Sequence, residues 1–118
     1  MRRLTTHVLD TARGVPAAGV RIDLSVFDGA GTSRLLATVH TNRDGRTDQP
    51  LLEGAAFAAG RYELAFHIGA YFTACGVALA APPFLDVVPV RFGIADADAH
   101  YHVPLLASPW TYSTYRGS

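Results

Sequence analysis

Alternation of apolar and polar residues is the feature that most constrains this chain. In residues 20–26 every second residue is apolar and the residues between are polar. Successive side chains of a β-strand point to opposite faces of a sheet, so this period of two predicts a half-buried strand. Residues 61–68 and 88–94 repeat the pattern. Pro89 takes an outward position in the last of these, and we expect an edge strand there because proline donates no ladder hydrogen bond.

Further short segments also predict strands, and turn-forming residues separate them. These segments are residues 4–10, 35–41, 101–106 and 112–115. Residues 70–75 are the one helical candidate, and Gly76 is well placed as its C-terminal cap. Many short strands and little helix predict an all-β sandwich. A chain of 118 residues fits one domain, covering residues 1–118.

Charge and cysteine content limit the classes of partner. The chain has 10 basic and 10 acidic residues, so no net field attracts nucleic acid or an anionic membrane surface. No apolar stretch approaches the roughly 20 residues that span a bilayer. Cys75 is the single cysteine and cannot form an intrachain disulfide, which favours a reducing compartment, the cytoplasm. We expect a buried structural thiol at Cys75.

Two histidines are predicted to share the outer face of one sheet. If Val8 points to the core, His7 points outward, and His102 points outward by the same alternation. Leu9 and Leu106 accompany them, and apolar groups on an outer face favour association with another copy. An imidazole pKa near 6.5 suits proton transfer, so this face is a candidate acid/base site. Each histidine taken singly is more typical of an ordinary surface or hydrogen-bonded residue.

A turn and an aromatic chain end supply further candidates. Arg46 follows the turn at residues 42–45, and its guanidinium is suited to carbonyl or carboxylate oxygens, although a solvated turn arginine fits the turn equally well. Chain ends are usually polar and frayed, yet Trp110, Tyr112 and Tyr115 lie within the last nine residues. We therefore expect those rings to be packed, and Ser118 to add hydrogen-bonding groups.

Several motifs together resemble one family. They are Leu-Thr-Thr-His-Val-Leu-Asp at residues 4–10, Asp-Gly-Arg at 44–46, His-Tyr-His-Val-Pro-Leu-Leu at 100–106 and the terminal Tyr-Arg-Gly-Ser at 115–118. In this order they resemble the 5-hydroxyisourate hydrolases of the transthyretin-like family. The resemblance spans nearly the whole chain, and the terminal motif is its most specific part.

The resemblance implies a fold, an assembly and an activity. The fold is a transthyretin-like β-sandwich of two four-stranded sheets with one short helix, assembled as a homotetramer (a dimer of dimers) with active sites between dimers. The reaction is hydrolytic ring opening of 5-hydroxyisourate in urate degradation, without a cofactor or metal. The implied catalytic residues are His7, Arg46, His102 and Ser118. The implied substrate-binding residues are His7, Arg46, Tyr115 and Arg116.

Three other interpretations remain at this point. A transthyretin-like carrier would bind a small ligand without chemistry, but it has no need of acid/base groups. A metal site would use His100 and His102 with His7 as a third ligand, although a bare His-x-His is weak support for one. An interaction module is the third, because fold does not fix function.

Overall fold

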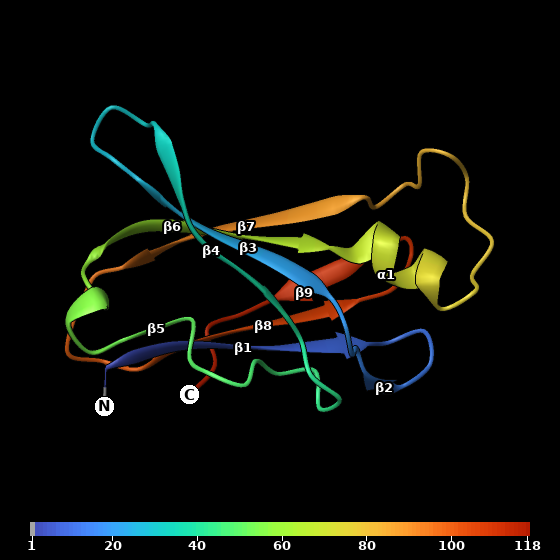
Figure 1. The fold of residues 1–118 in the computed structure, drawn as a ribbon, viewed down its shortest axis with the longest axis horizontal. Coiled ribbons are helices and arrows are strands. Elements are labelled where there is room, and N and C mark those ends of the chain that lie inside the picture. The colour runs from blue at the N-terminus through green and yellow to red at the C-terminus, as the bar shows by residue number, and fades with distance from the viewer. Residues whose placement is uncertain (1) are drawn as a thin grey trace.

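A computed structural model describes residues 2–118 as two facing β-sheets (Figure 1). The first sheet contains β1 (Arg3–Asp10), β2 (Val15–Pro16), β5 (Leu52–Glu53), β8 (Tyr101–Ala107) and β9 (Tyr112–Thr114). The second contains β3 (Arg21–Phe27), β4 (Ser33–His40), β6 (Gly60–His67) and β7 (Val87–Ile94). The predicted sandwich is confirmed, and the first sheet gains the short strand β5, which pairs with β1.

Strand order explains how distant segments meet. The second sheet has the order β4-β3-β6-β7 and is antiparallel throughout. Its edge strand β7 carries Pro89, as the sequence predicted. The first sheet has the order β2-β1-β8-β9, and β1 and β8 run parallel, which places Thr5 opposite His102 and His7 opposite Pro104. This parallel pair brings the two ends of the sequence together.

The core lies between the sheets and is built from alternate strand residues. β1 alternates half-buried and buried positions along its whole length, and β6 and β8 also direct apolar side chains inward. Burying one such side chain contributes about 1.5–3 kcal/mol to stability. The largest fully buried side chains include Leu4, Val8, Ile22, Leu24, Leu64, Phe66, Phe72, Ile94 and Leu105.

Helix α1 (Ile68–Ala74) closes one end of the sandwich, followed by the long loop to β7 (Figure 1). It begins two residues earlier than predicted because Ile68 is buried and starts the apolar face that Phe72 continues. It ends at Ala74, and Gly76 follows with a φ of 86°, which allows its N–H and that of Val77 to donate to carbonyls of the last turn. A short 3-10 turn, η1 (Gly54–Ala56), lies before β6. Neither helical segment among residues 2–118 is long and apolar enough to cross a membrane.

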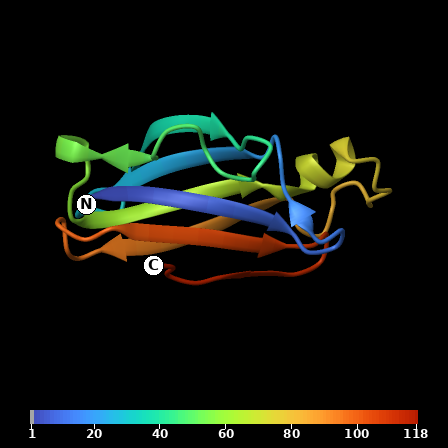
Figure 2. The same ribbon diagram turned by 90° about the horizontal axis from the view of Figure 1, so that it is seen from below.

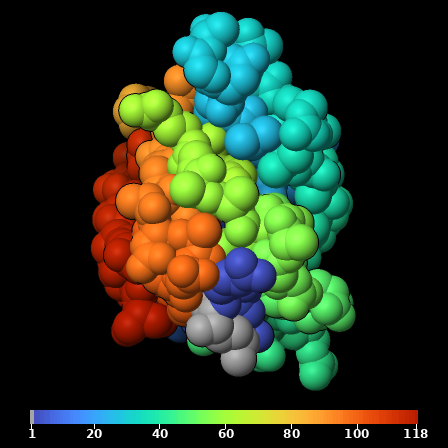
Figure 3. All heavy atoms as spheres, turned by 90° about the vertical axis from the view of Figure 1, so that its left-hand side faces the viewer, coloured from blue at the N-terminus to red at the C-terminus, as the bar shows by residue number. Residues whose placement is uncertain are grey.

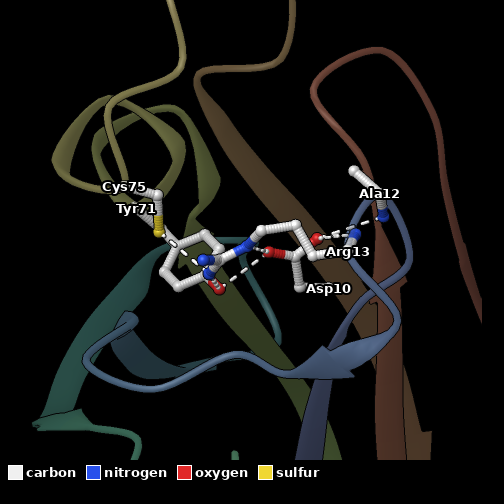
Figure 4. A network of polar contacts seen from close by, with 5 residues as sticks. All are labelled: Asp10, Ala12, Arg13, Tyr71 and Cys75. Carbon is white, nitrogen blue, oxygen red and sulfur yellow. Dashed lines mark hydrogen bonds and ion pairs between the residues drawn. The ribbon is translucent and has the colours of Figure 1, made fainter.

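Near the helix, a buried carboxylate organises a polar network that the sequence did not reveal (Figure 4). Asp10 is 1% exposed and accepts bonds from the Arg13 Nε (2.9 Å) and the Tyr71 hydroxyl (2.9 Å). Burial raises the pKa of Asp10, but these bonds outweigh burial and hold it below its usual value. Arg13 Nη2 also reaches Cys75 Sγ at 3.2 Å. The expectation of a buried Cys75 is wrong: the residue is exposed, because it caps the helix on the side away from the core.

The C-terminal segment returns along the outside of the first sheet. After β9, which pairs antiparallel with β8, it runs back toward the end of the molecule where the chain begins (Figure 2). In the space-filling view the red C-terminal segment forms one edge of the molecule, beside the orange segment that contains β7 and β8 (Figure 3). The last residues therefore lie close to the start of β1.

Candidate active site

A cleft of about 470 Å³ lies beside the outer face of the first sheet. It collects residues from β1, from the loop after β4, from β8 and from the chain end. Those residues are Arg3, Thr5, Thr6, Arg46, Thr47, Asp48, Pro50, His100, His102 and Ser118. Arg46, His102 and Ser118, all named from the sequence, therefore meet in one place.

His102 is held at the base of this cleft. Its Nδ1 lies 2.8 Å from the Thr5 hydroxyl, the residue opposite it on β1. Burial lowers the pKa of His102, and the positive potential of Arg46, together with His100 and His7, lowers it further. A lowered pKa keeps the ring neutral near neutral pH, which is the form that can accept a proton.

His7 lies on the same face and is tied to the turn that carries Arg46. Its Nε2 donates to the Asp44 carbonyl at 2.8 Å, which leaves Nδ1 as the acceptor of the neutral ring. Gly45 has a φ of 75°, and a Cβ there would collide with the Val8 carbonyl oxygen. The Gly45 carbonyl in turn accepts the Val8 N–H at 2.8 Å. The turn is thus bonded directly to β1, and Arg46 emerges from it into the cleft.

The chain end is fixed against His102. Gly117 N–H donates to the His102 carbonyl at 2.7 Å, forming an isolated antiparallel bridge. A Cβ on Gly117 would lie 2.7 Å from His102 Cδ2, so only glycine allows this approach. The bridge brings Ser118 into the cleft.

Tyr115 and Arg116 are not brought into this cleft. The Arg116 guanidinium lies 4.0 Å from the centre of the Tyr101 ring, and its Nη2 donates to the His100 carbonyl at 3.3 Å. Both residues line a different hollow, beside Phe92 of the opposite sheet. Tyr115 is 60% exposed.

Nor are the other aromatic side chains of the tail packed within one chain. Trp110 is 65% exposed and Tyr112 is 42% exposed. The expectation that the tail rings are packed is therefore not met inside a single chain. What holds the tail is the backbone pairing of β9 and Gly117 with β8.

Thr5, Arg3 and Asp48 are cleft residues that the sequence interpretation missed. Alternation did place Thr5 on the face of His7, but only the parallel pairing of β1 with β8 puts its hydroxyl against His102. The metal alternative gains no support, because residues 2–118 contain no group of three His, Cys, Asp or Glu residues arranged to hold an ion.

Sequence relatives agree on one name. The chain is 66% identical over 116 residues to 5-hydroxyisourate hydrolase 2 of Rhizobium meliloti, covering 98% of this chain and 96% of that protein. It is 60% identical to the 5-hydroxyisourate hydrolase of Ralstonia nicotianae, covering 100% of both chains.

Solved structures show the same fold. The structure of Klebsiella pneumoniae 5-hydroxyisourate hydrolase matches with a TM-score of 0.80 and 36% identity over 100% of both chains. Sea bream transthyretin in complex with thyroxine matches with a TM-score of 0.87 and 31% identity, covering 98% of this chain and 94% of that one. An (S)-allantoin synthase matches with a TM-score of 0.93 and 48% identity, and the chain spans 44% of that protein's length.

The family model agrees with these matches. The model described as "Transthyretin: HIUase/Transthyretin family" matches residues 4–117, nearly the whole chain. This range includes β1, the Arg46 turn, β8 and the chain end as far as Gly117. The chain belongs to the HIUase/transthyretin family.

Proposed function

We propose that this chain hydrolyses 5-hydroxyisourate, opening a cyclic amide to give 2-oxo-4-hydroxy-4-carboxy-5-ureidoimidazoline in urate degradation. The observation that carries the proposal is that His102, whose pKa is lowered, the Arg46 guanidinium and Ser118 at the chain end line one cleft. The relatives named as 5-hydroxyisourate hydrolases, up to 66% identical, support the same substrate. The reaction as we propose it needs no cofactor.

His102 is the proposed general base. The bond between its Nδ1 and Thr5 leaves Nε2 as the nitrogen available to a water molecule. Burial and neighbouring positive groups keep the ring neutral, so it can take a proton from water as the water attacks the ring carbonyl carbon. When the ring C–N bond then breaks, His102 can pass this proton to the departing nitrogen.

Arg46 is the proposed group that stabilises developing negative charge. Attack on the carbonyl carbon places charge on its oxygen, and a guanidinium that is already oriented stabilises that charge without reorganising. The Arg46 backbone N–H bonds Asn42 Oδ1 at 3.2 Å, and the turn is bonded to β1 through Gly45. His7, fixed to the same turn, is proposed to orient the heterocycle.

Ser118 is proposed to contact the substrate. His7 Nε2 donates to the Asp44 carbonyl, and His102 Nδ1 is bonded to the Thr5 hydroxyl, so neither of these bonds uses Ser118. The side chain of Ser118 is thus available for the ligand. Arg116, anchored on Tyr101, would help bind substrate indirectly by placing Gly117 and Ser118.

A substrate contact for Tyr115 requires a neighbouring copy, because Tyr115 lies outside the cleft of its own chain. We propose the homotetramer, a dimer of dimers, as the working assembly. The exposed Val87 on the edge strand β7, and the exposed Trp110, Tyr112 and Tyr115 around the short strand β9, support association. Residence in the cytoplasm stays a prediction that rests on the single cysteine.

The direct test follows freshly generated 5-hydroxyisourate by ultraviolet absorbance with and without the protein. We expect faster decay than the spontaneous rate, in proportion to protein concentration. Binding of the compound without faster decay would instead favour a carrier, and neither binding nor acceleration would favour an interaction module.

A further inference from the structure

Thr5 and His100 lie beside the proposed base, and a role for them in catalysis rests on the proposed hydrolase function. The Thr5 hydroxyl lies between two imidazoles, 2.8 Å from His102 Nδ1 and 3.4 Å from His100 Nε2. The two rings are nearly parallel, with an interplanar angle of 13° and centroids 6.5 Å apart. One hydroxyl therefore faces a nitrogen of each ring.

The proton count restricts how this bridge can be arranged. A threonine hydroxyl has one proton to donate and also accepts, whereas each neutral imidazole has one N–H and one bare nitrogen. In one arrangement Thr5 donates to His102 Nδ1, which forces the proton of His102 onto Nε2 and leaves no base in the cleft. In the other, His102 Nδ1–H donates to Thr5, and Thr5 donates to His100 Nε2. Thr5 could also accept from both rings, but its own proton would then have no acceptor on either ring. The second arrangement presents a bare Nε2 on His102 and gives the Thr5 proton an acceptor.

The second arrangement also suits the charged intermediate. When His102 accepts a proton at Nε2, both ring nitrogens carry hydrogen, so Nδ1 must donate. Thr5 already accepts that bond in the second arrangement, and no hydrogen has to move before the reaction. We propose that Thr5 and His100 are positioning residues that hold His102 as the Nδ1–H tautomer, with Nε2 free to take a proton from water.

His100 is built into the site in a way that fits this role. Its Nδ1 is buried and has no hydrogen-bond partner within residues 2–118. Its backbone carbonyl accepts from Arg116, so the residue is tied to the chain end that covers His102. A buried ring nitrogen without a partner lowers stability. The contact between His100 Nε2 and the Thr5 hydroxyl is a functional explanation for this placement of the His100 ring.

Spectroscopy on histidine-labelled protein tests the tautomer without substrate. In ¹H–¹⁵N spectra of the imidazole rings near neutral pH, with signals assigned by single histidine variants, we expect His102 with hydrogen on Nδ1. In Thr5→Val, which keeps the shape and removes the hydroxyl, we expect His102 to shift to the Nε2–H form. An Nε2–H tautomer in the unaltered protein, or an unchanged tautomer in Thr5→Val, would overturn the proposal.

Kinetics provide the second readout. Losing a hydrogen bond to a group that becomes charged should lower kcat about 10- to 100-fold in Thr5→Val, with a smaller change in KM. Thr5→Ser restores the hydroxyl and should recover most of that loss. Thr38→Val is the matched control, because Thr38 bonds Asp23 in the other sheet. Equal activity in Thr5→Val and Thr5→Ser would contradict the role of the hydroxyl.

Variants of His100 test its part even if a change at Thr5 impairs folding. A glutamine amide reaches the position of Nε2, whereas an asparagine amide reaches only that of Nδ1. We expect His100→Gln to retain clearly more kcat than His100→Asn, and equal losses in the two would overturn the role of His100. The tautomer readout needs no turnover, so failure of the hydrolase proposal itself would appear separately, as an unaltered protein that does not accelerate decay.

Discussion

Strand β1 carries a polar cluster at each end, and the two clusters differ in how fully their bonding groups are used. At one end, both Asp10 oxygens accept bonds, from Arg13, Tyr71 and two backbone N–H groups (Figure 4). At the other end, beside the cleft, Arg3 Nε and His100 Nδ1 are buried without a hydrogen-bond partner among residues 2–118. Saturated polar groups hold a fold together, whereas unsatisfied ones in a cleft mark a place for a ligand.

The pKa directions agree with this contrast. Burial raises the pKa of Asp10, but its hydrogen bonds lower it more, so the carboxylate stays charged and keeps its donors in place. Burial also lowers the pKa of His102, with help from Arg46, so the imidazole stays neutral and chemically available. Burial therefore serves architecture at Asp10, which is fully buried, and chemistry at His102, which is partly buried.

The largest expected effect is at the cleft. His102→Asn should lower turnover about 100-fold or more, because it removes the proposed base. Steady-state rates with 5-hydroxyisourate measure this, and a thermal melt confirms folding. His40→Asn, at an exposed histidine outside the cleft, should behave like the unaltered protein. A near-normal rate in folded His102→Asn would show that another group is the base.

A change in the Asp10 cluster should lower stability and leave activity unchanged. Asp10→Asn should reduce the free energy of unfolding by about 2 kcal/mol, because bonds to a buried charged group are lost. Activity per folded molecule should stay near normal. Chemical denaturation measures the first and titrated rates the second, with Asp98→Asn as an exposed control. An unchanged unfolding free energy would mean that Asp10 is not a structural anchor.

The chain end gives an intermediate effect. Gly117→Ala should lower kcat/KM about tenfold, because a methyl group meets the ring of His102 and shifts Ser118 or the base. Gly29→Ala is the matched control, since nothing lies within 4 Å of a Cβ there. If both variants are equally active, the close packing of Gly117 on His102 is not needed for the reaction.

A smaller effect concerns acid stability on the opposite sheet. Burial raises the pKa of Asp23, but bonds from His67, Thr38 and Arg21 outweigh it and bring it to about 2, below the reference value of 3.8. Folding thus favours the charged form of the Asp23 carboxyl group. The stability gained in this way is present above pH 3.8 and is lost as the pH falls toward 2. A shift of that size corresponds to about 2 kcal/mol, and solvent screening at this partly exposed carboxylate should reduce the loss to about 1 kcal/mol.

Comparison with Asp23→Asn isolates this contribution from that of Asp10. The variant should be less stable than the unaltered protein at neutral pH, and the difference should shrink as the pH falls below 4 in denaturant titrations. A difference that stays constant with pH would contradict the assignment.

The smallest effect is expected at Cys75. The side chain is exposed, so Cys75→Ser should change the free energy of unfolding by less than about 0.5 kcal/mol and leave activity intact. The native thiol should react with an aromatic disulfide reagent without denaturant. If the Cys75 thiol reacts only after unfolding, another copy of the chain covers it in the native assembly.

Residue patterns predicted more of the fold than of the bonding within it. Alternation and the turn residues between segments together identified the seven longer strands. Alternation also gave the outward faces of His7 and His102 and the outward position of Pro89, because side-chain direction has a period of two. Residue patterns gave no sign of β2 or β5, each of which is only two residues long. The general tendency of free cysteines to be buried was a wrong guide for Cys75, which follows the helix and is exposed.

The sequence by itself determined which faces the strands present, the turn at Gly45 and, through its motifs, the family. Only the tertiary structure decided which faces meet: β1 runs beside β8 over a separation of 97 residues, so Thr5 bonds His102, and Asp10 is buried against Tyr71. It also turned Tyr115 and Arg116 away from the cleft that Ser118 enters. The physical reason is that periodicity fixes the direction of a side chain along its own strand, whereas its bonding partners depend on pairings between distant segments.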